Sequence, residues 1–327
     1  MIMILIALAA GCASALMYAS VVSGAPISLL LFCLTPLPLM VAALGWGPLS
    51  ATIGGIVAAA ALGAIVGFPL CIAFAVTVGV PAWWLGHLVM LGRPISNSGS
   101  SNGAAQAVPV LEWYPIGRVL LWIAGFAGLS TIAALFPLGT DAAAISGALR
   151  ELFVQAIQAT GQSEAISSRE ADRLIDIMVT IVPMAAAMMA TTMLTFNLWL
   201  AAKITATSGR LHRSWPDLKR TALPPMTLVA LCVSVALSFV GGLLAIMAQI
   251  GTAALMMAYA LTGFAVLHTL TLELKSRLLW LSCTYAIAAM TGGWPVALAM
   301  VVLGLADATF GLRERFMRGR PPPLPAS

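Results

Sequence analysis

Charged side chains are scarce in this chain. Of its 327 residues only 16 are Lys or Arg and 11 are Asp or Glu, whereas 61% are hydrophobic. An ordinary soluble domain carries about 25% charged residues, because surface-to-volume scaling places many polar side chains on the outside of a water-soluble fold. The composition therefore excludes a soluble globular protein and predicts an all-α polytopic bundle of transmembrane helices.

Catalytic and metal-binding patterns are also lacking. The sequence has no Gly-x-Ser-x-Gly, no His-Glu-x-x-His and no P-loop, and it has only three histidines. Its five cysteines stand singly in apolar runs, with no Cys-x-x-Cys pair, which is typical of small buried side chains. We therefore expect no enzyme activity, no cofactor, no metal and no nucleic-acid partner. The cysteines are Cys12, Cys33, Cys71, Cys232 and Cys283.

One cysteine, Cys12, follows small residues in a way that resembles a lipoprotein cleavage site. Two observations oppose that interpretation: no Lys or Arg precedes Arg93, and the chain never becomes polar afterwards. A signal peptide has a positive N-terminal region. We interpret residues 2–23 as the first membrane helix instead.

Apolar runs of about 20 residues, the length that crosses a bilayer core, recur along the whole chain. Glycine and proline separate them, as in Gly47-Pro48 and Gly292-Gly293. Because the last two runs are short, we expect eight to ten spans. The runs cover 2–23, 26–45, 48–67, 70–92, 117–136, 174–202, 226–247, 251–272, 278–292 and 295–311.

The charges that do occur are segregated by sign. Segment 203–220 has five basic residues and one acid, and the C-terminal segment and the link after 272 are also basic. Segment 137–176 has six acids and three arginines. Basic loops lie on the cytoplasmic side of a membrane, so we expect both termini in the cytoplasm and 137–176 outside.

This topology predicts one transmembrane domain, 1–312, followed by a basic, proline-rich cytoplasmic tail, 313–327. We expect a flexible cytoplasmic loop at 93–116, an external loop at 137–173 and a basic cytoplasmic loop at 203–224. The external loop has apolar residues at helical spacing, including Ile145, Leu149 and Leu152, which predicts an amphipathic helix on the membrane surface. Ser167 and Glu170 form a capping box before the next helix.

Two cytoplasmic loops contain candidate functional residues. In "EWYPIGR" we expect Glu112 to pair with Arg118 across the Pro115 turn, with Trp113 and Tyr114 in the membrane interface; the cluster is either an anchor or a ligand or partner contact. In the basic loop, the turn of Trp215, Pro216 and Asp217 indicates an ordered segment. This loop either binds anionic lipid or a partner, or is a solvated loop.

The membrane interior has few polar residues. Asn197, preceded by three threonines, is the notable one, and it is either a helix-to-helix hydrogen bond or a ligand contact. No carboxylate or histidine occurs at mid-membrane. This absence argues against a proton-coupled transporter or pump, because such proteins need ionisable groups there.

Several segments together resemble a known family. "EWYPIGR", "FNLWLA", "SGRLHRSWPDLKRTALP" and "LGLADATFGLRERF" resemble the YybS-like family of bacterial integral membrane proteins of unknown function. That family is similar in turn to the substrate-binding components of energy-coupling-factor vitamin transporters. The resemblance implies a multi-pass protein of the bacterial inner membrane that captures a small molecule and depends on a transmembrane coupling subunit for energy.

Small residues recur every four positions in the first helix, at Ala7, Gly11, Ala15 and Ala19. Such a row lets another helix approach closely. The resemblance implies contact with the coupling subunit, because the vitamin-transporter components use a similar face; packing within the chain's own bundle is the alternative. Those components usually have about six spans, fewer than this chain.

Three functional hypotheses follow. The first is a substrate-capture component for a small, neutral or weakly polar molecule. The second is a structural or assembly protein that docks partners through its basic cytoplasmic loops. The third is a lipid-modifying enzyme at the inner interface, built from His212, Asp217 or Glu112.

Overall fold

The computed structural model describes residues 1–95, 110–159, 168–215 and 221–318. In these ranges the chain is helical apart from one two-stranded sheet, which confirms the all-α polytopic bundle. Among the described residues, seven segments are long and apolar enough to cross a membrane: Ile2–Ser23, Pro26–Trp46, Pro48–Ile65, Phe68–Val89, Ile116–Leu138, Arg169–Thr207 and Gly242–Leu270. Three shorter apolar helices are Met226–Leu237, Arg277–Met290 and Trp294–Phe310.

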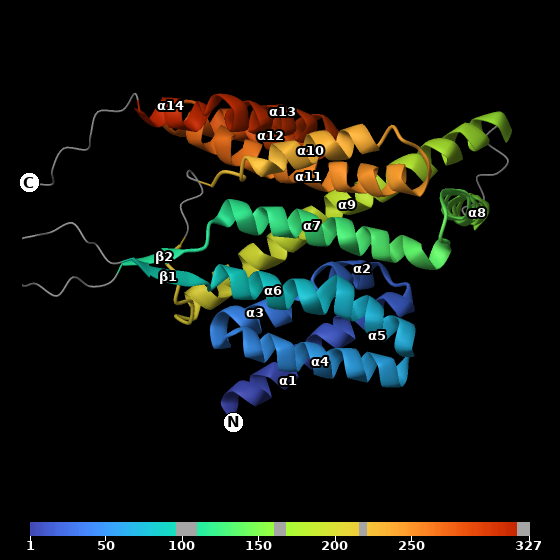
Figure 1. Cartoon of the computed structure of the whole chain (residues 1–327), viewed down its shortest axis with the longest axis horizontal. Coiled ribbons are helices and arrows are strands. Elements are labelled where there is room, and N and C mark those ends of the chain that lie inside the picture. The colour runs from blue at the N-terminus through green and yellow to red at the C-terminus, as the bar shows by residue number, and fades with distance from the viewer. Residues whose placement is uncertain (96–109, 160–167, 216–220, 319–327) are drawn as a thin grey trace, which may run out of the picture.

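The helices form two flanks with two long helices between them (Figure 1). The first flank contains α1 (Ile2–Ala19), α2 (Pro26–Cys33), α3 (Pro36–Trp46), α4 (Pro48–Ile65), α5 (Phe68–Phe74) and α6 (Val80–Val89). The second contains α10 (Met226–Leu237), α11 (Gly242–Leu270), α12 (Arg277–Met290), α13 (Trp294–Phe310) and α14 (Leu312–Arg318). Between them lie α7 (Ile116–Leu135) and α9 (Ser168–Thr207).

Glycine and proline end the helices as the sequence indicates, with one exception. Gly47 has φ +95°, a value that side chains disfavour, and Pro48 starts α4. The expected helices at 226–247 and 251–272 were wrong in their boundary. Gly241 and Gly242 have φ +88° and +66°, so α10 ends at Leu237 and α11 begins at Gly242.

The second expected span is interrupted in its middle. Helix α2 ends at Cys33 and α3 begins at Pro36. Pro36 has no N–H to donate to the preceding turn, and the Leu37 amide donates to the Leu34 carbonyl (3.0 Å) instead of continuing the pattern to Cys33. The carbonyl of Cys33 is therefore free to accept a hydrogen bond from another helix.

Helix α9 is longer than the expected span 174–202. Its 40 residues extend about 60 Å at 1.5 Å per residue, twice the thickness of a bilayer core. Its first turns lie beside α8 (Ala142–Ala159), a helix within the segment that the charge pattern predicts to be an external loop. Arg150 joins them through Asp172 (2.8 Å) and Asp176.

The apolar face of α8 is only partly buried. Ile145 and Leu149 are buried, but Leu152 is 50% exposed. Ser167 of the expected capping box lies outside the described residues, and helix α9 is described from Ser168 onward.

A short hairpin replaces part of the expected loop at 93–116. Strands β1 (Gly92–Ile95) and β2 (Val110–Trp113) are antiparallel, with Arg93 opposite Glu112. These two side chains form an exposed ion pair of 3.1 Å. The expected pair of Glu112 with Arg118 was wrong, because the strand register places Arg93 beside Glu112.

The two ends of the bundle differ in charge. One end holds the hairpin, the C-terminal end of α9 and α14, and the start of α1 lies toward it; α8 is at the opposite end (Figure 1). We call the first the basic end, because the basic residues described in 203–215 and in α14 lie there. The basic end corresponds to the side that the charge bias assigns to the cytoplasm.

Candidate functional site

A cavity of about 780 Å³ lies between α7, α9 and α11 and is bounded by residues of the basic loop. Its wall is mainly aliphatic and aromatic, with Ile123 from α7, Leu198 and Trp199 from α9, and Leu261 from α11. Small-molecule sites typically have volumes of about 300–1,000 Å³ and apolar walls with a few polar groups. The cavity has the size and lining of a ligand site.

The ionisable residues in the described part of this wall are all basic: Arg213, His268 and Arg277. They come from the basic loop, from the last turn of α11 and from the first residue of α12. The described lining includes no Asp or Glu. The polar part of the cavity therefore favours an anion over a cation.

Arg213 connects three separate segments. Its Nη1 donates to the Val89 carbonyl at the end of α6 (2.9 Å), and its Nη2 donates to the Tyr114 carbonyl after β2 (3.0 Å). The guanidinium also lies over the Trp113 ring, 5.8 Å from its centroid. Burial lowers the pKa of Arg213, but an arginine side chain keeps its proton in proteins. Its charge is thus used to hold the hairpin against α6.

Arg277 is placed differently. Its Nε is buried and has no hydrogen-bond acceptor among the described residues. Nearby on the wall, His268 Nε2 lies 2.9 Å from the Tyr285 hydroxyl, and the Tyr285 ring stacks on Phe264 with 6.0 Å between centroids. Of the three basic residues in the wall, Arg277 is the one with a buried N–H donor that has no acceptor among the described residues.

The structure brings the two candidate loops together at Arg213. Trp113 and Tyr114 contact it as described, whereas Pro115 and Arg118 are exposed, with the Arg118 guanidinium 6.0 Å from the Tyr114 ring. Trp215 lines the cavity, and Lys203 Nζ lies 5.3 Å from its ring.

Pro216 and Asp217 lie outside the described residues. His212 is exposed, and Glu112 forms an ion pair with Arg93 in the exposed hairpin. Of the three residues in the enzyme hypothesis, His212 and Glu112 are therefore the two that are described. Both are exposed, and they belong to different segments.

Asn197 forms a helix-to-helix hydrogen bond. Its Nδ2 donates to the free carbonyl of Cys33 (2.8 Å) and to Met193 one turn earlier (2.8 Å). The residue is fully buried, and its Oδ1 has no partner among the described residues. Asn197 does not line the cavity; it supports the break between α2 and α3.

The row of small residues on α1 packs against α4. Ala7, Gly11 and Ala15 are buried, and Ala19 is half-buried. A Cβ on Gly54 of α4 would lie 2.6 Å from the Ala7 carbonyl oxygen, and a Cβ on Gly11 would overlap the Gly54 carbonyl. Ala7 and Gly11 are thus covered by the chain's own helix, so another subunit could reach these two residues only by displacing α4.

A family model described as "Predicted membrane protein (DUF2232)" matches residues 12–308. The chain belongs to this family. The match covers every helix from α2 to α12, most of α13 and the part of α1 from Cys12 onward, so the cavity lies entirely within the family region. No curated protein and no solved structure matches the chain. It is a multi-pass membrane protein of a family whose description carries no activity.

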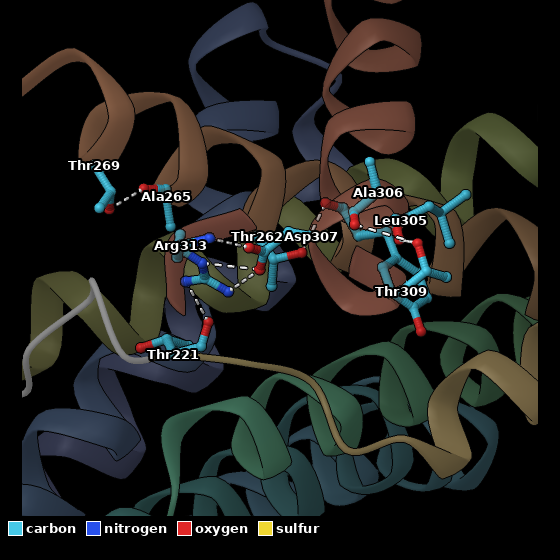
Figure 2. Close-up of polar contacts among 10 residues, drawn as sticks. Thr221, Thr262, Ala265, Thr269, Leu305, Ala306, Asp307, Thr309 and Arg313 are labelled. Atoms are coloured by element: carbon cyan, nitrogen blue, oxygen red, sulfur yellow. Dashed lines mark hydrogen bonds and ion pairs between the residues drawn. The ribbon is translucent and has the colours of Figure 1, made fainter. Parts of the chain in front are cut away.

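At the end of the DUF2232 region lies a buried ion pair that the sequence analysis missed. Asp307 of α13 accepts hydrogen bonds from Arg313 Nε (2.9 Å) and Nη2 (2.6 Å), while Arg313 Nη1 donates to the Thr221 carbonyl (2.8 Å). Figure 2 shows Arg313 between these two partners. The sequence feature that could have indicated this pair is a carboxylate, Asp307, within an apolar run and six residues before Arg313. The pair anchors α14 and, through Thr221, the last part of the basic loop.

Proposed function

We propose that this protein is a non-enzymatic binding component that holds one small, largely apolar molecule in the cavity between α7, α9 and α11. The observation that carries the proposal is the cavity itself, with its volume of about 780 Å³ and its mainly apolar wall. A wall of this kind can contact an apolar molecule over much of its surface.

The position of the cavity bears on how the protein would work. It lies at the basic end, next to the loop that the charge bias assigns to the cytoplasm. A component of an uptake system would hold its ligand there before release to the inside, with energy from another subunit. In this proposal a coupling subunit would contact a surface other than the Ala7–Ala19 row, because α4 covers Ala7 and Gly11 of that row.

The experiment that tests the proposal is native mass spectrometry of the protein released from nanodiscs. We expect a bound small molecule on the wild-type protein. Replacing Ala202 in the cavity wall by Phe should remove the bound mass, because the new ring would fill the space. Ala186→Phe is the matched control, since Ala186 is on the same helix but is exposed.

The outcomes are distinct. A wild-type protein with no bound molecule, or equal retention in both variants, would contradict the binding function. Size-exclusion profiles and melting temperatures of the two variants show whether each has folded. A folded Ala202→Phe protein that still binds would also count against this cavity.

A second candidate is a structural or assembly protein that docks partners at the basic end. The hairpin extends beyond the bundle there (Figure 1), and Trp215 is 46% exposed. A photo-crosslinker at Leu111, which is exposed on β2, should then capture one defined protein in native membranes. Diffuse labelling, together with a bound small molecule, favours the binding function.

A further inference from the structure

We infer that the cavity takes an amphiphile with one anionic head group, and that Arg277 holds this head group. The inference rests on the proposed binding function and specifies the class of ligand. It starts from the buried Nε of Arg277, which has no acceptor among the described residues. Buried N–H groups are nearly always paired, because an unpaired one loses its hydration without compensation. The Arg277 guanidinium therefore lacks an acceptor among the described residues, and a ligand in the cavity that this side chain lines can supply one.

The other basic residues of the wall do not have this property. Both Nη atoms of Arg213 donate to backbone carbonyls, and His268 shares its Nε2 with Tyr285. Arg277 takes part in no ion pair among the described residues, and no acid is found in the described lining. A guanidinium with a free donor in an apolar site binds an anionic oxygen more strongly than a neutral one.

The rest of the cavity determines what must be attached to that anion. Its wall is mainly hydrocarbon, so the bulk of the ligand must be apolar. Phe196 and Trp199 line the cavity, yet they are also 44% and 47% exposed on a membrane-spanning helix. An opening beside these two side chains would admit a molecule from the lipid side. A lipid-like molecule that enters from the bilayer fits this opening better than a free anion from water.

The depth of Arg277 agrees with such a ligand. It is the first residue of α12 and follows the link that contains Lys275, at the boundary of an apolar helix. An amphiphile places its head group at this level and its chain toward the membrane interior. The head group would meet Arg277 while the chain lies along α7, α9 and α11.

Binding of three probes to the protein in nanodiscs of neutral lipid tests the inference: dodecyl phosphate, dodecanol and inorganic phosphate. We expect dodecyl phosphate to bind about tenfold or more tightly than dodecanol, as one charged hydrogen bond implies. Inorganic phosphate should bind far more weakly than either. Arg277→Gln should abolish the preference for dodecyl phosphate and leave dodecanol binding unchanged. Arg277→Lys should keep part of the preference, because lysine retains the positive charge.

Lys275→Gln is the control, because Lys275 is exposed and two residues away. It removes the same charge and should keep the preference. Retention of the preference in Arg277→Gln, or its equal loss in Lys275→Gln, overturns the role of Arg277.

Equal binding of dodecanol and dodecyl phosphate to the wild type overturns the anionic ligand class but leaves the binding function standing. If inorganic phosphate binds as well as dodecyl phosphate, the lipid-like source is overturned. Failure of both alkyl probes contradicts the proposed function itself.

Discussion

Asp307 of α13 and Arg313 of α14 form a buried ion pair across the turn at Gly311. Their side chains are 9% and 5% exposed, and the Asp307 carboxylate also accepts the Arg313 backbone N–H (2.9 Å). Since Arg313 reaches the Thr221 carbonyl as well, one guanidinium joins α14 to the last part of the basic loop. Removing one partner would leave an uncompensated buried charge.

We therefore predict that Asp307→Asn lowers the free energy of unfolding by about 3–5 kcal/mol, the usual cost of breaking a buried pair. Chemical denaturation in detergent measures this change. Arg150→Ala is the comparison, because the ion pairs of Arg150 are exposed and worth about 1 kcal/mol or less. Similar losses in the two variants would contradict the buried pair as a structural anchor.

The contact of Gly11 with Gly54 gives a second prediction. Gly11→Ala adds a Cβ where the Gly54 carbonyl already lies, so we expect a loss of about 1–3 kcal/mol and a lower melting temperature. Gly125→Ala on α7 is the control, since a Cβ there meets no atom within 4 Å. If Gly11→Ala melts like Gly125→Ala, the close packing of α1 on α4 is disproved.

A third prediction concerns the hairpin. Arg213→Met removes two charge-assisted hydrogen bonds to backbone carbonyls, each worth about 1.5–3 kcal/mol. Amide hydrogen exchange in 110–114 should accelerate, because the hairpin loses its attachment to α6. Arg210→Met is the matched control: Arg210 is exposed and lies 4.8 Å from the Trp46 ring. Equal exchange in both variants would show that Arg213 does not hold the hairpin.

The parts of the fold that could be predicted depend on local chemistry. The first helix and the break at Gly47-Pro48 follow from apolar runs and from residues with special backbone angles. Gly241-Gly242 is also a helix break at glycines with special backbone angles. It was not predicted, because the residues on both sides of it are apolar and hydropathy alone does not separate the two helices there. The break before Pro36 lies inside one continuous apolar run, so hydropathy does not reveal it.

The candidate site depends on contacts between distant segments, and these could not be predicted. The cavity combines α7, α9 and α11 with Arg277, and hydropathy does not say which helices are neighbours. The pairing of Glu112 with Arg93 depends on strand register across the segment 96–109. Arg277 was counted only as part of a basic link. The role proposed for it depends on a buried Nε without an acceptor among the described residues, which only the folded structure can show.

The last prediction concerns Asn197 and the interrupted span. Asn197→Leu removes the hydrogen bond to the Cys33 carbonyl, and the Leu37 amide does not replace the donor because it bonds to Leu34. Hydrogen bonds between membrane helices are worth about 0.6–1.7 kcal/mol, so we expect a loss of about that size. In a chain with Cys33 as its single cysteine, maleimide labelling should also become faster as α2 loosens from α9.

Thr191→Val is the matched control for Asn197→Leu. Thr191 is equally buried on α9, but its hydroxyl donates only to Ala187 of the same helix (2.8 Å). Its loss should leave the labelling rate of Cys33 unchanged, because no contact between helices is removed. Equal labelling in the two variants would mean that proline geometry alone maintains the break, and that Asn197 only fills space beside it.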